Sequence, residues 1–304
     1  GETEYALRLL PIGGYCAMEG EEEESDDPHS LGNQSFLKKV FIFAAGAAMN
    51  FLIGFLIILV LYSGVQAFYS TRLVGFAPEF TLTGEAGLQQ GDILYKVDGE
   101  RIYLYSDLEL FFSRGNGKSF DLVVERNGEK VALNDFPLVK KEFSNTDGKP
   151  YQGYGLYFGY EEASVLSKLK YSWYNTVDFV RIIRYSLQEL VRGNAGMDDL
   201  SGPVGIVTTI VQVGEESESA RDAVDNILYF AALIAINLAV MNLLPIPALD
   251  GGKIFFLTIN TISRKLFHRQ IPEKYENYIH ATGFVLLMGL MLVVTFHDVL
   301  KHFV

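Results

Sequence analysis

Three long apolar stretches constrain this chain more than any other feature of its sequence. Residues 40–71 carry no charged side chain, residues 226–249 form a second uncharged run, and residues 277–296 form a third. A helix needs about 20 apolar residues to cross about 30 Å of hydrocarbon. The sequence therefore predicts a multi-pass α-helical membrane protein with transmembrane segments at 40–69, 226–262 and 278–297. Buried core helices are the alternative, which three runs of this length fit poorly.

Basic residues predict how the chain is oriented, because they gather on the cytoplasmic side of membrane proteins. They precede the first span and fill the loop between the second and third spans: Lys38, Lys39, Arg264, Lys265, Arg269 and Lys274. Residues 1–39 and 263–277 are therefore expected in the cytoplasm, and residues 72–224 outside the cell membrane. The predicted location is the cell membrane, with the long insertion extracytoplasmic.

Composition excludes several classes of protein. The net charge of −12 argues against a nucleic-acid-binding surface. Part of that charge lies in the acidic run at residues 21–27, which is expected to be a solvated loop. The single cysteine, Cys16, excludes an internal disulfide and a thiolate zinc cluster.

The extracytoplasmic stretch begins with a small α+β domain, predicted at residues 72–140. Strands are expected at 73–76, 120–125 and 130–133, and a helix at 106–114. Asp98-Gly99 and Asn127-Gly128 are typical of tight turns. Residues 141–224 are expected to hold a linker and amphipathic helices. One of these, 164–192, fits a membrane surface and protein packing equally well, and residues 200–206 suggest a turn.

Asp250 ends the second apolar run and points to a functional site. A carboxylate at the edge of a membrane span usually has a metal, a proton or an ion-pair partner, since desolvation of the charge is costly. Pro245 and Pro247 break the helix just before it, which is tolerated around a protein-lined cavity. A broken helix beside an acid indicates a site rather than a simple anchor.

Several motifs connect these features to a known family. Residues 86–99 closely resemble the core segment of a PDZ domain, a fold that takes extended peptides onto a strand edge. The chain as a whole resembles the site-2 protease family of intramembrane zinc metalloproteases. The resemblance is to the bacterial form of the regulator-of-sigma-factor protease type, which contains an inserted PDZ domain. The motifs that carry this resemblance are residues 10–15, 45–51, 86–99, 200–203 and 242–252.

The resemblance implies a zinc ion held by two histidines and one aspartate, with Asp250 as that aspartate. It also implies a glutamate base within a His-Glu-x-x-His motif. This sequence contains no such motif, and none of its five histidines has the required spacing. Family order places the motif just upstream of Gly1, so truncation is the simplest explanation and a natural pseudoprotease the alternative. His280, at the start of the third span, is a poor substitute ligand.

Further roles are implied for residues around Asp250. Asn50, Asn242, Pro245 and Pro247 are expected to bind or orient an extended substrate, and an interhelical hydrogen bond is an equal alternative for Asn50. A membrane-associated β-hairpin at residues 8–15, containing Gly13 and Gly14, is expected to pair with substrate.

The implied substrates are single-span membrane proteins that have already been trimmed outside, such as anti-sigma factors or signal-peptide remnants. Peptide tails at the PDZ domain and membrane lipid are further expected partners. The main alternative function is a non-catalytic membrane PDZ adaptor or pseudoprotease. A transporter is disfavoured, because no inverted repeat is visible.

Overall fold

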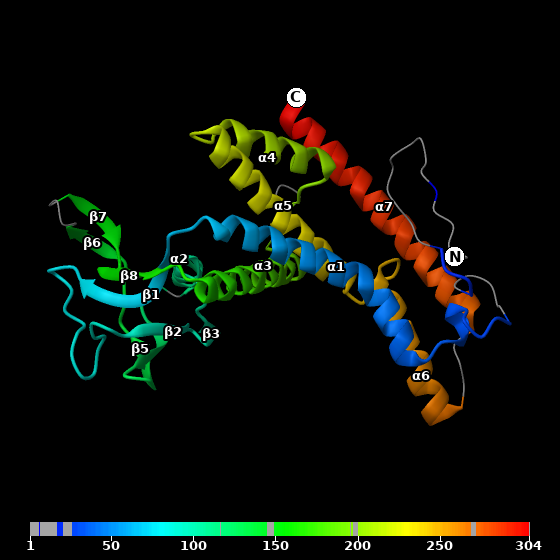
Figure 1. Cartoon of the computed structure of the whole chain (residues 1–304), viewed down its shortest axis with the longest axis horizontal. Helices are drawn as coiled ribbons and strands as arrows, with labels where there is room; N and C mark the ends of the chain where they lie inside the picture. Colours follow the sequence, from blue (N-terminus) through cyan, green and yellow to red (C-terminus); the bar gives the residue numbers. More distant parts are fainter. Residues whose placement is uncertain are drawn as a thin grey trace. The chain divides into compact units, whose positions relative to one another are not determined.

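The computed structural model describes residues 6, 17–20, 26–115, 117–144, 149–194, 196, 200–268 and 272–303 (Figure 1). The chain forms two compact units. One comprises Gly1–Gly46 with Asn242–Leu287, and the other comprises Ala47–Met241 with Met288–Val304. The expected hairpin at residues 8–15, with Gly13 and Gly14, lies outside the described residues and stays a prediction.

Three of the described helices are long and apolar enough to cross a membrane. They are α1 (Phe36–Ser63), α5 (Ala220–Asn242) and α7 (Glu273–Phe303). In their most apolar stretches only 17%, 17% and 6% of residues are buried within the protein, so most of these side chains are left to contact lipid. The membrane character inferred from the three apolar runs is confirmed. A short 3₁₀ turn, η1 (Leu31–Asn33), precedes α1.

The second predicted span is interrupted. Helix α5 ends at Asn242 and helix α6 (Asp250–Phe267) begins at Asp250, so the seven residues 243–249 between them are non-helical apart from turns. The two prolines at 245 and 247 explain the break, because neither can donate the backbone hydrogen bond of a helix interior. The single segment predicted at 226–262 is thus two helices joined by a loop.

A six-stranded antiparallel sheet follows α1, and we call residues 67–162 the sheet domain. Its strand order is β5-β4-β2-β1-β8, with β3 paired to β2, and β6 and β7 form a separate hairpin. The elements are β1 (Ala67–Phe76), β2 (Ile93–Val97), β3 (Glu100–Arg101), α2 (Tyr105–Arg114), β4 (Phe120–Arg126), β5 (Glu129–Phe136), β6 (Lys141–Ser144), β7 (Pro150–Gly153) and β8 (Leu156–Glu162).

Two tight turns set the register of this sheet. Asn127 and Gly128 both have positive φ, 53° and 84°, and join β4 to β5 so that Arg126 pairs with Glu129. Asp98 and Gly99 have the same character and join β2 to β3. Turns of this kind match the twist of antiparallel strands, which is why both dipeptides predicted them correctly.

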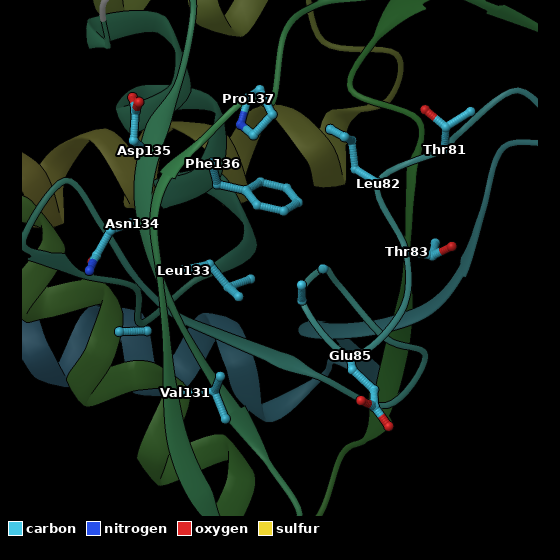
Figure 2. A pocket seen from close by; sticks show the side chains of 13 residues that line it. Thr81, Leu82, Thr83, Glu85, Val131, Leu133, Asn134, Asp135, Phe136 and Pro137 are labelled. Atoms are coloured by element: carbon cyan, nitrogen blue, oxygen red, sulfur yellow. The ribbon is translucent and has the colours of Figure 1, made fainter.

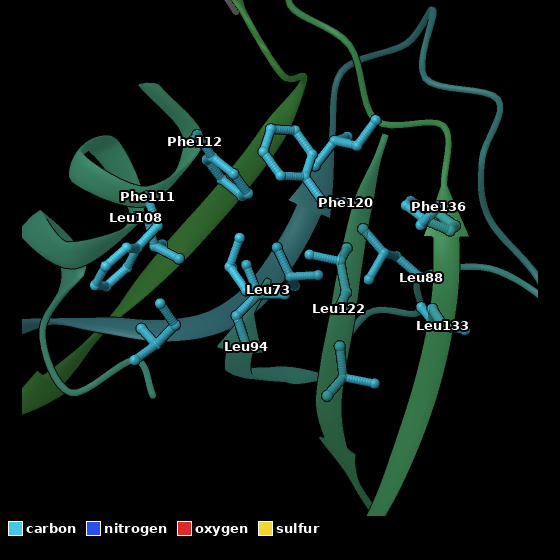
Figure 3. Packing of buried hydrophobic residues seen from close by; sticks show 14 of the residues in the cluster. Leu73, Leu88, Leu94, Leu108, Phe111, Phe112, Phe120, Leu122, Leu133 and Phe136 are labelled. Atoms are coloured by element: carbon cyan, nitrogen blue, oxygen red, sulfur yellow. The ribbon is translucent and has the colours of Figure 1, made fainter. Parts of the chain in front are cut away.

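The sheet domain is closed by apolar side chains from the strands and from α2. Leu73, Leu94, Leu122 and Val124 are fully buried, and Phe112 of α2 packs among them (Figure 3). The sheet extends beyond the predicted range of 72–140 at both ends, because β8 pairs along β1 from Ala67 to Phe76. That pairing joins strands about 90 residues apart, which local periodicity does not indicate.

Strand β5 lies at one edge of the sheet and borders a pocket of about 620 Å³. Residues 81–87 form the opposite wall. Leu133 and Phe136 of β5 lie inside the pocket, with Phe136 toward Leu82 (Figure 2). An edge strand beside an open pocket is a place where an extended chain can add to a sheet.

Helix α3 (Val165–Arg192) begins at the N-cap Ser164, whose hydroxyl accepts from the Ser167 N–H, and ends at Gly193 with φ 74°. Buried Ile58, Phe179 and Ile236 connect α3 with α1 and α5. Packing against protein, one of the two alternatives for this helix, is therefore present. Several exposed residues of α3 are nevertheless apolar: Val165, Leu166, Leu169, Trp173 and Ile182.

Residues 200–206 start a helix instead of forming only a turn. Gly202 is the N-cap and Pro203 the first residue of α4 (Pro203–Glu215). The carboxylate of Asp298, from α7, accepts the N–H groups of Gly202 and Gly205, both at 2.8 Å. A Cβ at Gly202 would lie only 2.9 Å from that carboxylate, so the two glycines make room for a buried cap.

Candidate metal and substrate site

The loop of residues 243–249 is held by backbone hydrogen bonds between residues close in sequence. The Ile246 N–H donates to Leu244 O at 2.7 Å, and the Leu249 N–H donates to Ile246 O at 3.2 Å. Ala248 has φ 76°, which is unusual for a residue with a side chain and costs of the order of 1 kcal/mol or more. This strained residue lies two positions before Asp250, so the surrounding contacts must fix it.

His280 of α7 provides one of those contacts. Its Nδ1 accepts the Ala248 N–H at 2.9 Å, and its ring lies 5.4 Å from that of Phe256 in α6. Gly283, one turn further along α7, lies against Pro247, since a Cβ at Gly283 would come 2.5 Å from the Pro247 Cβ. His280 and Gly283 are therefore positioning residues for the loop.

Two glycines after Asp250 let α6 start close to the loop. A Cβ at Gly251 would overlap the backbone of Leu243 and Leu244, and one at Gly252 would overlap the carbonyl of Ile246. Both glycines are buried. The Asp-Gly-Gly sequence thus has a steric reason: only glycine permits the backbone to fold back at this distance.

Asp250 is the first residue of α6 and is half-buried. Its carboxylate faces Gly46 of α1, because a Cβ on Gly46 would lie 3.9 Å from Asp250 Oδ2. Gly46 of α1 therefore lies next to the start of α6. A carboxylate in the first turn of a helix also interacts favourably with the helix dipole.

The structure places the other predicted site residues as follows. Asn242 is the last residue of α5, and Pro245 and Pro247 lie in the loop. Asn50 lies four residues after Gly46 on α1 and belongs to the second compact unit, so its role stays a prediction. His280 and Gly283 were missed. No local sequence signal points to them, because their contacts with Ala248 and Pro247 depend on how α7 packs against the loop.

Asp250 cannot form a metal site alone. Among the described residues, no three histidine, cysteine, aspartate or glutamate side chains come together to hold a metal ion. The His280 Nδ1 is engaged by the Ala248 N–H and is not a free ligand. Of the ligand set that the family resemblance implies, the described residues contain the expected aspartate, and no catalytic step can be derived through a metal from them.

Three described helices are long and apolar enough to span a membrane, and a carboxylate follows the break between α5 and α6. The model of peptidase family M50 matches residues 1–290. The chain belongs to this family, the site-2 proteases, which are metalloendopeptidases.

Individual relatives agree with this assignment. A predicted zinc metalloprotease of Clostridium perfringens is 34% identical, over 99% of this chain and 84% of the relative. The regulator of sigma-W protease RasP of Bacillus subtilis is 33% identical, over 99% of this chain and 68% of the relative. The zinc metalloprotease RasP of Shouchella clausii is 33% identical, over 90% of this chain and 62% of its own length.

Proposed function

We propose that this chain acts in an intramembrane zinc endopeptidase in which Asp250 is a zinc ligand. The supporting observation is the Asp250 carboxylate at the start of α6, facing Gly46 beside a strained loop. The remaining ligands, two histidines, and the glutamate base would come from a His-Glu-x-x-His segment, which this sequence does not contain. Zinc would supply an activated water as the nucleophile.

The broken helix before Asp250 suits the handling of an extended substrate. A helical substrate hides its carbonyls in its own hydrogen bonds and must unwind before it is cut. Asn242, at the end of α5, offers an amide for such a backbone, and Pro245 and Pro247 keep the loop from continuing as helix. These three residues are the proposed substrate-binding group, together with Asn50, Gly13 and Gly14.

The ligand role is tested by Asp250→Asn in a protein that also carries the His-Glu-x-x-His segment. We expect bound zinc, measured by atomic emission, to fall at least about tenfold, with a matching loss of cleavage. Asp225→Asn is the matched control, because Asp225 is an exposed carboxylate on α5 and should leave zinc and cleavage unchanged. Normal zinc content in Asp250→Asn would overturn the assignment.

The proposed substrates are membrane proteins with a single span, already shortened outside. Anti-sigma factors and signal-peptide remnants are the expected classes, and one relative is named a regulator of sigma-W protease. We further infer that the sheet domain is a PDZ domain facing outside, and that it limits access or binds the trimmed tail. The pocket between β5 and residues 81–87 is an edge suited to an extended peptide.

The boundaries of the sheet domain allow a clean test of this role. Its ends meet, since the Ala163 N–H donates to Gln66 O at 2.9 Å, so excising residues 67–162 leaves a gap that closes without a linker. We expect the excised protein to keep zinc but to accept membrane proteins with large outer domains. Loss of zinc on excision would contradict a separate gating domain.

The alternative, a membrane PDZ adaptor without catalysis, rests on the missing His-Glu-x-x-His motif. The zinc measurement separates the two functions. An adaptor would bind peptide tails and hold no zinc.

A further inference from the structure

A cavity of about 840 Å³ lies where α6 meets the first turns of α1 and α7. Every lining residue belongs to one compact unit. Ala248 and Lys253, which flank Asp250 in sequence, both line it, so the cavity reaches the loop that positions the proposed ligand. Neither the proposed metal site nor the proposed substrate-binding residues account for it.

The charged side chains that line the cavity are mainly cationic. Lys39, Lys253 and Arg264 line it, whereas Glu276 is the one carboxylate among the lining residues. Glu276 accepts a hydrogen bond from the Asn260 side chain at 3.3 Å, which ties that carboxylate to α6. Lys39 Nζ in turn donates to Gly32 O at 2.7 Å. Three cations and one acid give the lining an excess of positive charge, which favours an anionic ligand.

A buried donor adds to this preference. His280 lines the cavity, and because its Nδ1 accepts the Ala248 N–H, the neutral ring carries its proton on Nε2. That Nε2 is buried and has no hydrogen-bond partner among the described residues. Buried donors normally have an acceptor, so this nitrogen is an unmet donor beside the cavity, although it has no surface open to it.

The rest of the lining is apolar. Phe36 and Phe43 of α1, Leu257 of α6 and Phe284 of α7 contribute carbon surface, and Phe284 is 58% exposed. Since these residues lie on membrane-length helices α1 and α7, or beside them on α6, an acyl chain can run along them. A soluble anion alone would leave this surface unused.

We propose that the cavity binds the phosphate group of an anionic membrane lipid. Arg264 and Lys253 contact the phosphate, and the acyl chain lies along Phe36 and Phe284. Basic pockets between transmembrane helices recognise anionic headgroups through such a combination, and the planar guanidinium of an arginine pairs well with phosphate oxygens. Lipid in this cavity also stabilises the backbone of Ala248, two residues before Asp250.

The test titrates the purified chain, in a neutral detergent, with dihexanoylphosphatidylglycerol, dihexanoylphosphatidylcholine and inorganic phosphate. Binding is read from the midpoint of thermal unfolding and from ligand retention in native mass spectrometry. We expect phosphatidylglycerol to bind at least about tenfold more tightly than the other two. Equal binding of phosphatidylcholine would overturn the anionic preference, and equal binding of inorganic phosphate would overturn the lipid.

Paired variants assign the site to the cavity. Arg264→Gln and Lys253→Gln should each weaken phosphatidylglycerol binding about fivefold to tenfold. Lys265→Gln is the matched control, because Lys265 is an exposed neighbour on the same helix outside the cavity. An equal loss in Lys265→Gln would show general charge attraction and overturn the site. Unfolding midpoints without lipid identify any variant that fails to fold, and Arg264→Lys then replaces Arg264→Gln.

The assay is independent of the proposed peptidase function, since it needs neither zinc nor cleavage. A chain that binds phosphatidylglycerol but whose Asp250→Asn variant keeps zinc would retain the lipid site and lose the metal assignment. A chain that does not bind phosphatidylglycerol but whose Asp250→Asn variant loses zinc would lose the lipid site and retain the metal assignment.

Discussion

The sheet domain and the Asp250 loop reach a defined structure by different means. In the sheet domain, fully buried Leu73, Leu94 and Leu122 fix the strands by removing apolar surface from water. At the loop of residues 243–249, Gly251 and Gly252 of α6 let its backbone approach closely, and His280 accepts a single N–H, that of Ala248. A core built from large side chains can repack after a change, whereas backbone contacts at glycine leave no space for one extra carbon.

The largest expected effect tests the loop. Gly251→Ala would place a Cβ against the backbone of Leu243 and Leu244, and we expect a loss of more than about 3 kcal/mol in the free energy of unfolding. Gly289→Ala is the control, because no atom lies within 4 Å of a Cβ at that helical position. Thermal unfolding in detergent compares the two. A Gly251→Ala protein as stable as Gly289→Ala would break the comparison.

The sheet domain should instead lose stability when a buried side chain is shortened and leaves a void in its core. Leu122→Ala removes a side chain that is 0% exposed, and we expect a loss of about 3 kcal/mol, from lost burial and an imperfectly closed void. Val74→Ala, on β1 and 46% exposed, should change stability by less than about 0.5 kcal/mol. If both substitutions cost the same, apolar burial is not what holds this domain.

The same contrast explains what the sequence could predict. The three apolar runs, the helix at 105–114 and the hairpin at Asn127-Gly128 follow from local periodicity and turn chemistry, and they were predicted within a few residues. The pairing of β8 with β1 was not predicted, since it joins strands with no shared local signal. The six-stranded sheet therefore appeared as a shorter domain.

The candidate site divides in the same way. Asp250, Pro245 and Pro247 were found because an acid and two prolines are exceptional beside an apolar run. The contact of His280 with Ala248 could not be read from the sequence, because it depends on how α7 lies against the loop. An isolated histidine at the start of a span gave no indication of its partner.

The joint between the sheet domain and α3 sharpens the comparison, because it is polar and buried. Arg181 of α3 donates to Asp107 of α2 at 3.0 Å, and Asp178 lies beside both. Burial raises the pKa of Asp178 to about 8, and Asp107 adds to the shift while Arg181 opposes it. Tyr62 of α1 and Tyr229 of α5 also face Asp178.

A pH titration tests this joint. The folded state keeps a proton on Asp178 that the unfolded chain releases above about pH 4. Its contribution is therefore fully present below that pH, falls as pH rises, and is lost by about pH 8, with a slope of at most about 1.4 kcal/mol per unit. Asp178→Asn, which stays neutral and can still donate, should flatten the curve of unfolding midpoint against pH. Parallel curves of unfolding midpoint against pH for the two proteins would contradict the raised pKa of Asp178.

The smallest expected effect asks whether close glycine contact is peculiar to the Asp250 loop. Asp298 caps α4 through the N–H groups of Gly202 and Gly205, in the other compact unit. Asp298→Asn keeps an acceptor oxygen but removes the charge at the helix start, and we expect a loss of about 1 kcal/mol. Asp298→Ala leaves two buried donors unpaired and should cost about 2 kcal/mol. If Asp298→Ala unfolds at the wild-type temperature, the two glycines serve another purpose. If Asp298→Ala costs more than Asp298→Asn, close glycine contact with a buried acceptor fixes a backbone end in this unit too, as Gly251, Gly252 and His280 do at the Asp250 loop. The contrast with the sheet domain is then one of mechanism rather than of place.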